Sequence, residues 1–380
     1  MWLATDQERR RLGIAAALGT CAFALLGLPS QASAQSAGYA KVRDLPNPYR
    51  LVEGWPTLPK SMNGGHWGEV SRVQIDAAGN IWVFHRCFAT EPPGSAVCLG
   101  ANKDFPPLLK FDPSGKLLAS LGTGLFVYPH GFTIDGDGNL WTTDVNDKAT
   151  VLGMSAKNAA GVVMGQEVLK LDPASGKVLM TLGTEGVTGN GPNTFDMPPG
   201  VAVAPNGDVL VTDGHRRNEL ATGRVVKFDR NGKFIKTWGH MGSEPGNFID
   251  PHDIAIGGSQ NHVYIADRQN RRIQVFDQDG NFLAAWPQFG EVNSVFVGKD
   301  DTIYAGTGFA DPIATKGEIR GILVGSAKDG SLRAFIPDPV DLNTVVRGTA
   351  ASGITADSQG NIYAADVGSH NLRKYELQTH

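Results

Sequence analysis

A hairpin frame that repeats six times constrains the fold more than any other feature of this chain. Each copy holds two short alternating apolar segments around a Gly, Asn or Asp turn, which is typical of β-hairpins. The copies begin at Val73, Phe132, Val201, Ile254, Val295 and Ile354. A second hairpin follows the first five copies, as in LLKFDPSGKLLASLG from Leu108. Four strands per repeat, at a period of several tens of residues, predict a radial β-propeller.

The last repeat predicts how the ring closes. It stops at LRKYEL, one strand short of the other repeats. We predict that the segment Tyr49–Pro56 supplies the missing strand, because closure leaves no long unpaired sheet edge. The expected fold is therefore all-β: a six-bladed propeller over residues 49–380, closed by an N-terminal strand and preceded by a linker at 35–48. The 48 glycines and 22 prolines fit many short strands and tight turns.

Residues 1–34 are expected to be an export signal. Arg9, Arg10 and Arg11 precede an apolar stretch that ends at Leu28, and the small residues of Ala32–Ala34 fit a cleavage site. The apolar stretch is too short and too rich in Gly and Ala to span a membrane, so we expect no membrane span in the mature protein. A periplasmic or secreted location follows from this interpretation.

The cysteines and the net charge limit the kinds of partner and of metal site that we expect. Cys21 leaves with the signal, so Cys87 and Cys98 remain as a pair in an oxidising compartment. A disulfide is the direct interpretation, and a thiolate metal site is the alternative. The formal net charge of −4 points to no nucleic-acid partner and to no anionic membrane partner.

Two histidines in matching positions are the first chemical signal. The residues expected to face the channel, just before the first strand of each repeat, are Ser71, His130, Gly200, His252, Asn293 and Ser352. Three imidazoles with a fourth position open are a catalytic zinc pattern, and blade six would supply the third ligand. Blade six offers Ser352, which is a doubtful third position. The alternative is that His130 and His252 only cap turns after prolines.

Three further residues lie where second strands end. Arg86 and Arg268 follow the second strands of blades one and four, and their guanidinium groups could hold a substrate carboxylate. The alternative is salt bridging with strand-end aspartates such as Asp144 and Asp267. His215 leaves the same edge of blade three and could act as a base or as a replacement metal ligand, although a loop histidine is more often only solvated.

Aspartates and insertions recur in the frame as well. Asp144, Asp213, Asp267 and Asp366 occupy one frame position in four repeats, which indicates a structural role. The insertions at 86–107, 145–166 and 215–223 all connect second to third strands. They are therefore expected on one face, over the channel.

The motifs VFHR at 83–86, YPHGFTIDGDGNLWTTDV at 128–145, GKFIKTWG at 232–239, and PGNFIDPHDIAI with YIADRQNRRIQVF at 245–276 resemble a known family. They resemble the NHL-repeat propellers and, among them, the catalytic core of peptidyl-α-hydroxyglycine α-amidating lyase. The resemblance implies a zinc enzyme that cleaves a carbinolamide into a peptide amide and glyoxylate. It matches His130 and His252 to zinc ligands, and Arg86 and Arg268 to active-site arginines.

The chain departs from that family at defined positions. The third zinc histidine falls at Ser352, and the aspartate that also serves the family's calcium falls at Gly353. Calcium is therefore a doubtful cofactor, whereas Zn²⁺ or another divalent transition metal is expected. The family's active-site tyrosine falls near His215, which could move a proton.

Three functions remain open at this stage. The first is an exported, metal-dependent lyase-like enzyme with a small-molecule or peptide-derived substrate, hydroxylated or carboxylated. The second is a non-catalytic NHL propeller that binds a ligand or a protein on its top face. The third is a lactonase-type propeller hydrolase, which ranks lower because such sites use acidic and Asn ligands where this chain has His130 and His252.

Overall fold

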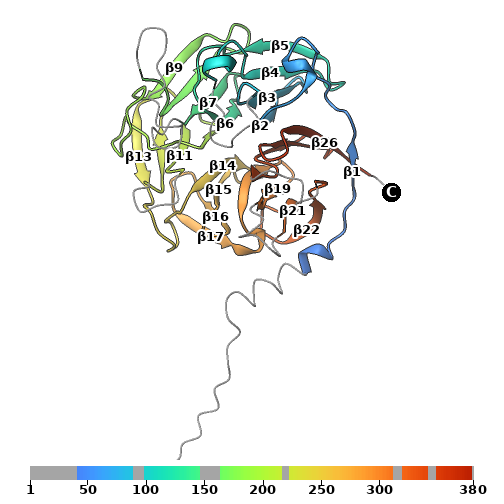
Figure 1. The fold of residues 1–380 in the computed structure, drawn as a ribbon. Helices are drawn as coiled ribbons and strands as arrows, with labels where there is room; N and C mark the ends of the chain where they lie inside the picture. Colours follow the sequence, from blue (N-terminus) through green and yellow to red (C-terminus); the bar gives the residue numbers. More distant parts are fainter. Residues whose placement is uncertain are drawn as a thin grey trace, which may run out of the picture.

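Six four-stranded antiparallel sheets stand around a central axis in the computed structural model (Figure 1). The structure describes residues 41–88, 98–145, 163–215, 222–310, 319–340 and 348–378. Each innermost strand contacts the innermost strand of the next sheet, and the strand of the sixth sheet contacts that of the first. The predicted all-β, six-bladed propeller is confirmed.

The strands follow one another outward in each blade. Blade 1 contains β2 (Val70–Ile75), β3 (Ile81–His85), β4 (Leu108–Phe111) and β5 (Leu117–Leu121). Blade 2 contains β6 (Pro129–Ile134), β7 (Leu140–Asp144), β8 (Glu167–Leu171) and β9 (Val178–Gly183). Blade 3 contains β10 (Gly200–Val203), β11 (Val209–Asp213), β12 (Arg224–Phe228) and β13 (Phe234–Trp238).

The second half of the ring has the same order. Blade 4 contains β14 (Pro251–Gly257), β15 (His262–Asp267), β16 (Arg272–Phe276) and β17 (Phe282–Trp286). Blade 5 contains β18 (Val292–Val297), β19 (Thr302–Thr307), β21 (Gly321–Ser326) and β22 (Leu332–Pro337). Blade 6 contains β24 (Gly353–Ala356), β25 (Ile362–Asp366), β26 (Asn371–Leu377) and β1 (Tyr49–Val52).

The remaining described elements are short. A two-stranded ribbon pairs β20 (Phe309–Ala310) with β23 (Gly348–Thr349). The 3₁₀ helices are η1 (Asn63–Gly65), η2 (Gly100–Asn102) and η3 (Pro287–Phe289). Within the described ranges, no helix is long and apolar enough to cross a membrane.

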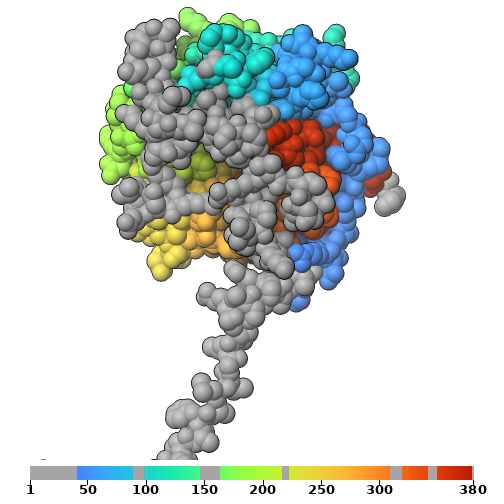
Figure 2. Space-filling model, viewed as in Figure 1, coloured from blue at the N-terminus to red at the C-terminus, as the bar shows by residue number. Residues whose placement is uncertain are grey.

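The N-terminal strand closes the ring, as predicted. β1 pairs antiparallel with β26, from Tyr49 opposite Leu377 to Val52 opposite Lys374. The N-terminal segment lies against the C-terminal strand in the space-filling view (Figure 2). The two ends of the propeller are therefore held together by backbone hydrogen bonds, and β26 is covered by β1 instead of forming the outer edge of blade 6.

Aspartate-centred turns explain why the hairpins form where the sequence predicts them. In blade 2, Asp135 Oδ1 accepts backbone N–H groups of Asp137 and Asn139, and Trp141 Nε1 donates to Asp135 Oδ2 at 2.9 Å. Gly138 takes the left-handed conformation that the turn needs, with φ at 88°. The side chain of the aspartate thus replaces backbone partners in the turn.

The hydrophobic core lies between blades and not on the axis. One buried cluster joins Leu210 and Val225 of blade 3 to Ile254, Ile265 and Phe276 of blade 4. Similar clusters join the other neighbouring blades. Alternating apolar residues on both faces of each sheet are buried in this way, so the axis is free for polar groups.

The strand-end aspartates have the structural role that their recurrence indicates. Asp144 accepts the backbone N–H groups of Val127 and Tyr128 at 2.8 and 2.6 Å. Asp267 accepts the N–H of Ile249 at 2.9 Å. In blades 3 and 6 the equivalent aspartates hold the N–H groups of other residues that precede an inner strand. These bonds fix the segment that leads to each channel-facing position.

The disulfide predicted from the cysteine pair is present, because Cys87 and Cys98 are bonded. It follows directly after Arg86, and Cys98 N donates to Val127 O at 2.9 Å. The bond thereby ties the end of β3 to the connection that leads into blade 2. The expected signal at residues 1–34 lies outside the described residues.

One buried strand pair in blade 2 carries two acids. In blade 3, Asp213 pairs in register with Arg224, at 2.9 Å between the charged groups. In blade 2, Asp144 instead faces Glu167. Burial, and after it the charge of Asp144, raises the pKa of Glu167 to about 8. Blade 2 therefore carries an electrostatic cost once both groups ionise.

We predict that Glu167→Gln raises the stability of the protein at pH 8 but hardly changes it near pH 4.5. The folded state holds the Glu167 proton more tightly than the unfolded state, so rising pH favours unfolding until the folded pKa of about 8 is passed. Glutamine has no such penalty, and Tm should rise by about 2 °C or more at pH 8. Thermal unfolding at both pH values measures the effect, and an equal shift at both would contradict it.

Candidate metal centre

At the start of several inner strands, a register shift leaves the channel-facing residue without a partner in the strand pairing. In β14, Pro251 pairs with Asp267 and Asp253 with Ala266, so His252 is skipped by the ladder. His130 is skipped in β6 in the same way. The first pairs of β2 and β18 show the same shift. A bulge of this kind redirects a side chain. In each of these strands, the redirected side chain is that of the residue predicted to face the channel.

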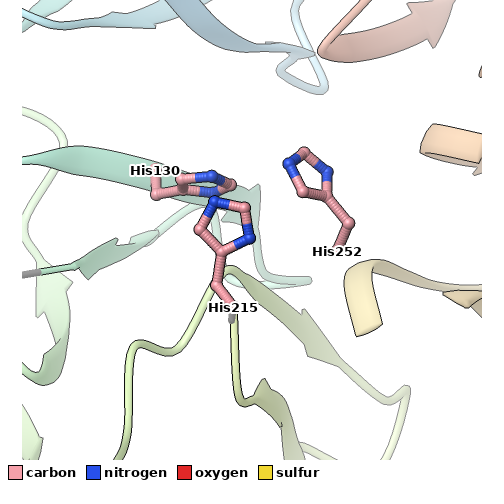
Figure 3. Close-up of side chains that lie close together, drawn as sticks. All are labelled: His130, His215 and His252. Atoms are coloured by element: carbon pink, nitrogen blue, oxygen red, sulfur yellow. The ribbon is translucent and has the colours of Figure 1, made fainter. Parts of the chain in front are cut away.

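Three imidazoles meet at the channel, from blades 2, 3 and 4 (Figure 3). The ring centroids lie 4.6 Å apart for His130 and His215, 4.9 Å for His215 and His252, and 5.0 Å for His130 and His252. Each ring offers a nitrogen within 4.8 Å of the other two. His130 and His252 are buried and His215 is nearly so. Histidines that only cap turns would have no reason to lie so close together.

One nitrogen of each ring is held by an acceptor of the protein. His130 Nδ1 donates to Pro199 O at 2.8 Å, and His252 Nδ1 donates to Asn293 O at 2.6 Å. His215 Nδ1 lies 2.8 Å from Asp250 Oδ1. A carbonyl or carboxylate oxygen only accepts, so Nδ1 carries the proton and Nε2 has a lone pair in the neutral ring. Bonds of this kind orient histidines that bind metals.

The arrangement fits a divalent transition metal. Zinc binds imidazole nitrogen at about 2.0–2.1 Å in tetrahedral geometry, which puts two such nitrogens about 3.4 Å apart. The three ring nitrogens lie within 4.8 Å of one another, so they would move closer together to bind one ion. Burial lowers the pKa of His130 and His252 well below the usual value, and it lowers that of His215 against the opposing charge of Asp250. The rings are thus neutral, as metal ligands must be.

The structure brings His215 beside the two predicted histidines. Ser352 is buried, and its hydroxyl hydrogen-bonds with Thr349 Oγ1. His215 follows β11 by one residue, after Gly214 with φ at 112°. The backbone N–H of His215 donates to Met197 O at 3.1 Å, which holds the residue over the channel. The candidate third ligand therefore comes from blade 3, at the end of a second strand.

Arg86 is buried near the imidazoles and has an acidic partner. Its NH1 donates to Glu69 Oε2 at 2.5 Å, and its Nε donates to Pro129 O at 3.2 Å. The guanidinium carbon lies 4.0 Å from the centre of the Tyr128 ring. Glu69 and Arg86 belong to one blade, so this pair differs from the predicted alternative with Asp144.

Arg268 repeats this arrangement in blade 4. Its Nε and NH2 both donate to Asp250 Oδ2, at 2.8 and 2.5 Å. The other oxygen of Asp250 accepts His215 Nδ1, so one carboxylate orients both a candidate ligand and an arginine. Burial, and after it the charge of Arg268, lowers the pKa of His252.

The acidic partners could have been found from the repeat frame. Glu69 and Asp250 both stand two positions before a channel-facing residue, in the two blades that have an arginine after the second strand. In the repeat frame, an acidic residue and an arginine thus occur together in blades 1 and 4. The frame places His215 at the same edge of blade 3 and so allows it as a replacement ligand, but its closeness to the other imidazoles depends on the direction in which β11 leaves its sheet.

Comparisons with known proteins agree with the fold and relate the chain to amidating enzymes. Residues 206–305 match a family model described as DUF5128, a 6-bladed beta-propeller. The chain is 35% identical over 222 residues to peptidyl-glycine alpha-amidating monooxygenase of Mus musculus, with 54% of this chain and 20% of that protein covered. It is 29% identical over 248 residues to peptidyl-alpha-hydroxyglycine alpha-amidating lyase 1 of Drosophila melanogaster, with 60% and 40% covered.

A solved structure supports the fold alone. A gluconolactonase from Xanthomonas campestris superposes with a TM-score of 0.51 at 15% identity, over 87% of this chain and 95% of that one. The chain spans less than half the length of the mouse and fly relatives. The resemblance to amidating lyases that the motifs indicate is thus supported by relatives that carry that name.

We predict that His215→Ala removes bound metal as His130→Ala and His252→Ala do. Loss of one of three imidazole ligands should weaken zinc binding by at least about 100-fold, since each ligand contributes strongly to affinity. Titration with a competing chromophoric chelator measures the dissociation constant. Ser352→Ala is the matched control, with affinity within about threefold of the parent. Retention of zinc with loss of turnover in His215→Ala would instead identify His215 as a base.

We also predict that Asp250→Asn weakens metal binding without removing it. The amide keeps the shape of the carboxylate but cannot accept a charge-assisted bond from both His215 and Arg268. Loss of an outer partner of a ligand costs roughly 10- to 100-fold in affinity. The same chelator titration tests this, and unchanged affinity would contradict it.

Proposed function

We propose that this protein is an exported, zinc-dependent lyase that acts on a small or peptide-derived substrate with a hydroxyl and a carboxylate on one carbon. The three-imidazole cluster, with an arginine on each of two sides, is the observation that carries this proposal. Relatives named amidating lyase suggest the reaction class. The expected export signal and the disulfide support passage through an oxidising compartment.

The reaction proposed is the cleavage of a carbinolamide, R–CO–NH–CH(OH)–COO⁻. The hydroxyl loses its proton, the C–N bond breaks, and the amide nitrogen gains a proton. The products are R–CO–NH₂ and glyoxylate, with no other reactant. A zinc ion bound by the three imidazoles would supply a Lewis acid that eases loss of the hydroxyl proton.

The charges around the cluster favour an anionic substrate. Arg86 is balanced by Glu69, and Arg268 by Asp250, while the imidazoles are neutral. A divalent ion would therefore leave the cluster with excess positive charge. A carboxylate next to the reacting carbon would offset that charge, and an alkoxide that forms during the reaction would do so further.

The two arginines can position that carboxylate. Arg86 uses Nε and NH1 in its bonds to Pro129 and Glu69, and Arg268 uses Nε and NH2 in its bonds to Asp250. NH2 of Arg86 and NH1 of Arg268 carry the donors that we assign to the substrate. Because buried acids fix both guanidinium groups, little ordering is needed when the substrate binds.

Assignment of His215 to the metal changes the expected proton route. Its Nδ1 bond to Asp250 suits a metal ligand as well as a general base, but its distance from the other two imidazoles favours the ligand role. A ligand nitrogen has no lone pair left for proton transfer. We therefore assign the hydroxyl proton to solvent or to the departing amide nitrogen.

We predict glyoxylate release from an α-hydroxyglycine amide such as α-hydroxyhippurate, at a rate that depends on added zinc. Arg86→Met and Arg268→Met should each lower kcat/KM by roughly 10- to 100-fold, because each removes a charge-assisted bond to the substrate carboxylate. A substrate with its carboxylate capped as an amide is the matched control, since both variants should process it as the parent does. A colorimetric glyoxylate assay follows the reaction of the free acid, and chromatography of the released amide R–CO–NH₂ follows both substrates, because the capped one yields glyoxylamide.

Other results would favour the alternative functions. Zinc binding without turnover of any hydroxyglycine amide would support a propeller that binds a ligand or a protein on its top face. Hydrolysis of a lactone under the same conditions, without glyoxylate release, would support a lactonase-type hydrolase.

A further inference from the structure

One arginine reaches backbone carbonyls of four blades across the channel. Arg72 follows the channel-facing Ser71 in β2, and its side chain is 3% exposed. Its NH1 donates to Ser71 O at 2.9 Å and to Ser352 O. Its NH2 donates to His252 O at 3.1 Å and to Pro199 O at 3.4 Å. These oxygens belong to blades 1, 6, 4 and 3, so the guanidinium group lies at the axis.

The acceptors around Arg72 form the oxygen set that a hard cation prefers. Besides the four carbonyl oxygens, the carboxylate of Asp253 lies near Arg72, with Oδ1 at 3.5 Å from Arg72 NH2. Carbonyl and carboxylate oxygens are the usual ligands of calcium. Here a side chain of the protein occupies their centre.

The neighbouring strand leaves no room for a ligand-bearing side chain. A Cβ atom at Gly353 would lie 2.5 Å from Arg72 Cα and 2.8 Å from Ser71 O, which are backbone atoms that cannot move aside. The carboxylate that the family resemblance would put at this position therefore does not fit. The residues present at the axis do not form a calcium site.

We infer that the guanidinium group of Arg72 occupies the place of a bound cation in the channel, and we call it the built-in cation. We also infer that Arg72 positions two of the candidate zinc ligands. Pro199 O accepts both Arg72 NH2 and His130 Nδ1, and His252 is held through its own carbonyl. A guanidinium group stays protonated at physiological pH even when buried, and Asp253 balances its charge. The inference on the ligands rests on the proposed metal centre, whereas the inference on the built-in cation does not.

The test compares the parent protein with Arg72→Ala and a matched control, Arg320→Ala. Arg320 is another buried, ion-paired arginine, with Asp338 as its partner in blade 5. Zinc affinity is measured by chelator competition, and Tm by thermal unfolding of the metal-free proteins. Each variant is measured with about 10 mM guanidinium chloride and with potassium chloride at the same concentration.

We expect Arg72→Ala to lose at least tenfold in zinc affinity and Arg320→Ala to stay within threefold of the parent. Guanidinium, but not potassium, should restore part of both the affinity and the Tm of Arg72→Ala. Calcium should not raise the Tm of the metal-free parent. If Arg72→Ala fails to fold, Arg72→Lys takes its place, with an expected affinity loss of at least threefold and a preserved Tm.

Several results would overturn the inference. Zinc affinity unchanged or increased in the Arg72 variant would do so, as would an equal loss in Arg320→Ala. Rescue by potassium as effective as rescue by guanidinium would show that the site recognises no specific cation. If the parent binds no zinc, the proposed metal centre fails, and the guanidinium dependence of the Tm of Arg72→Ala still tests the built-in cation.

Discussion

The site at the channel depends on the bulge at the start of the inner strands. Blade closure brings six inner strands around one axis, but a regular ladder would keep every side chain in the sheet pattern. The register shifts in β6 and β14 release His130 and His252 from that pattern and turn them to the channel. Strand-end aspartates hold the preceding segment in place, so the bulge is a fixed feature of the fold.

Charge balance is the second constraint on this channel. Three arginines are buried close to the imidazoles, and each has one buried acid: Glu69, Asp250 or Asp253. Unpaired, these charges would cost several kcal/mol each in desolvation. Paired, they form a rigid polar frame around neutral imidazoles. The frame has capacity for a divalent ion and for an anionic substrate, and this links the packing of the channel to the proposed chemistry.

Much of the fold could be predicted from the sequence, because it depends on local patterns. Hairpin turns, alternation and the missing last strand predict six blades and the β1–β26 closure. The frame also predicts the positions of His130 and His252. For the third imidazole, the frame predicts the edge of blade 3 at which His215 lies but not its distance from the other two. His215 leaves the end of β11, and its approach to the axis depends on Gly214, on the Met197 contact and on Asp250 from the next blade. Nothing in the sequence distinguishes Arg72 from an ordinary strand residue.

We propose that three imidazoles, one from each of blades 2, 3 and 4, bind one metal ion. X-ray absorption spectroscopy of the zinc-loaded protein tests it most directly. We expect three nitrogen ligands at about 2.0 Å with outer-shell scattering from three imidazole rings, and two rings in the spectrum of His215→Ala supplied with excess zinc. A parent spectrum with two rings or fewer, or one with sulfur ligands, would rule out a three-histidine centre.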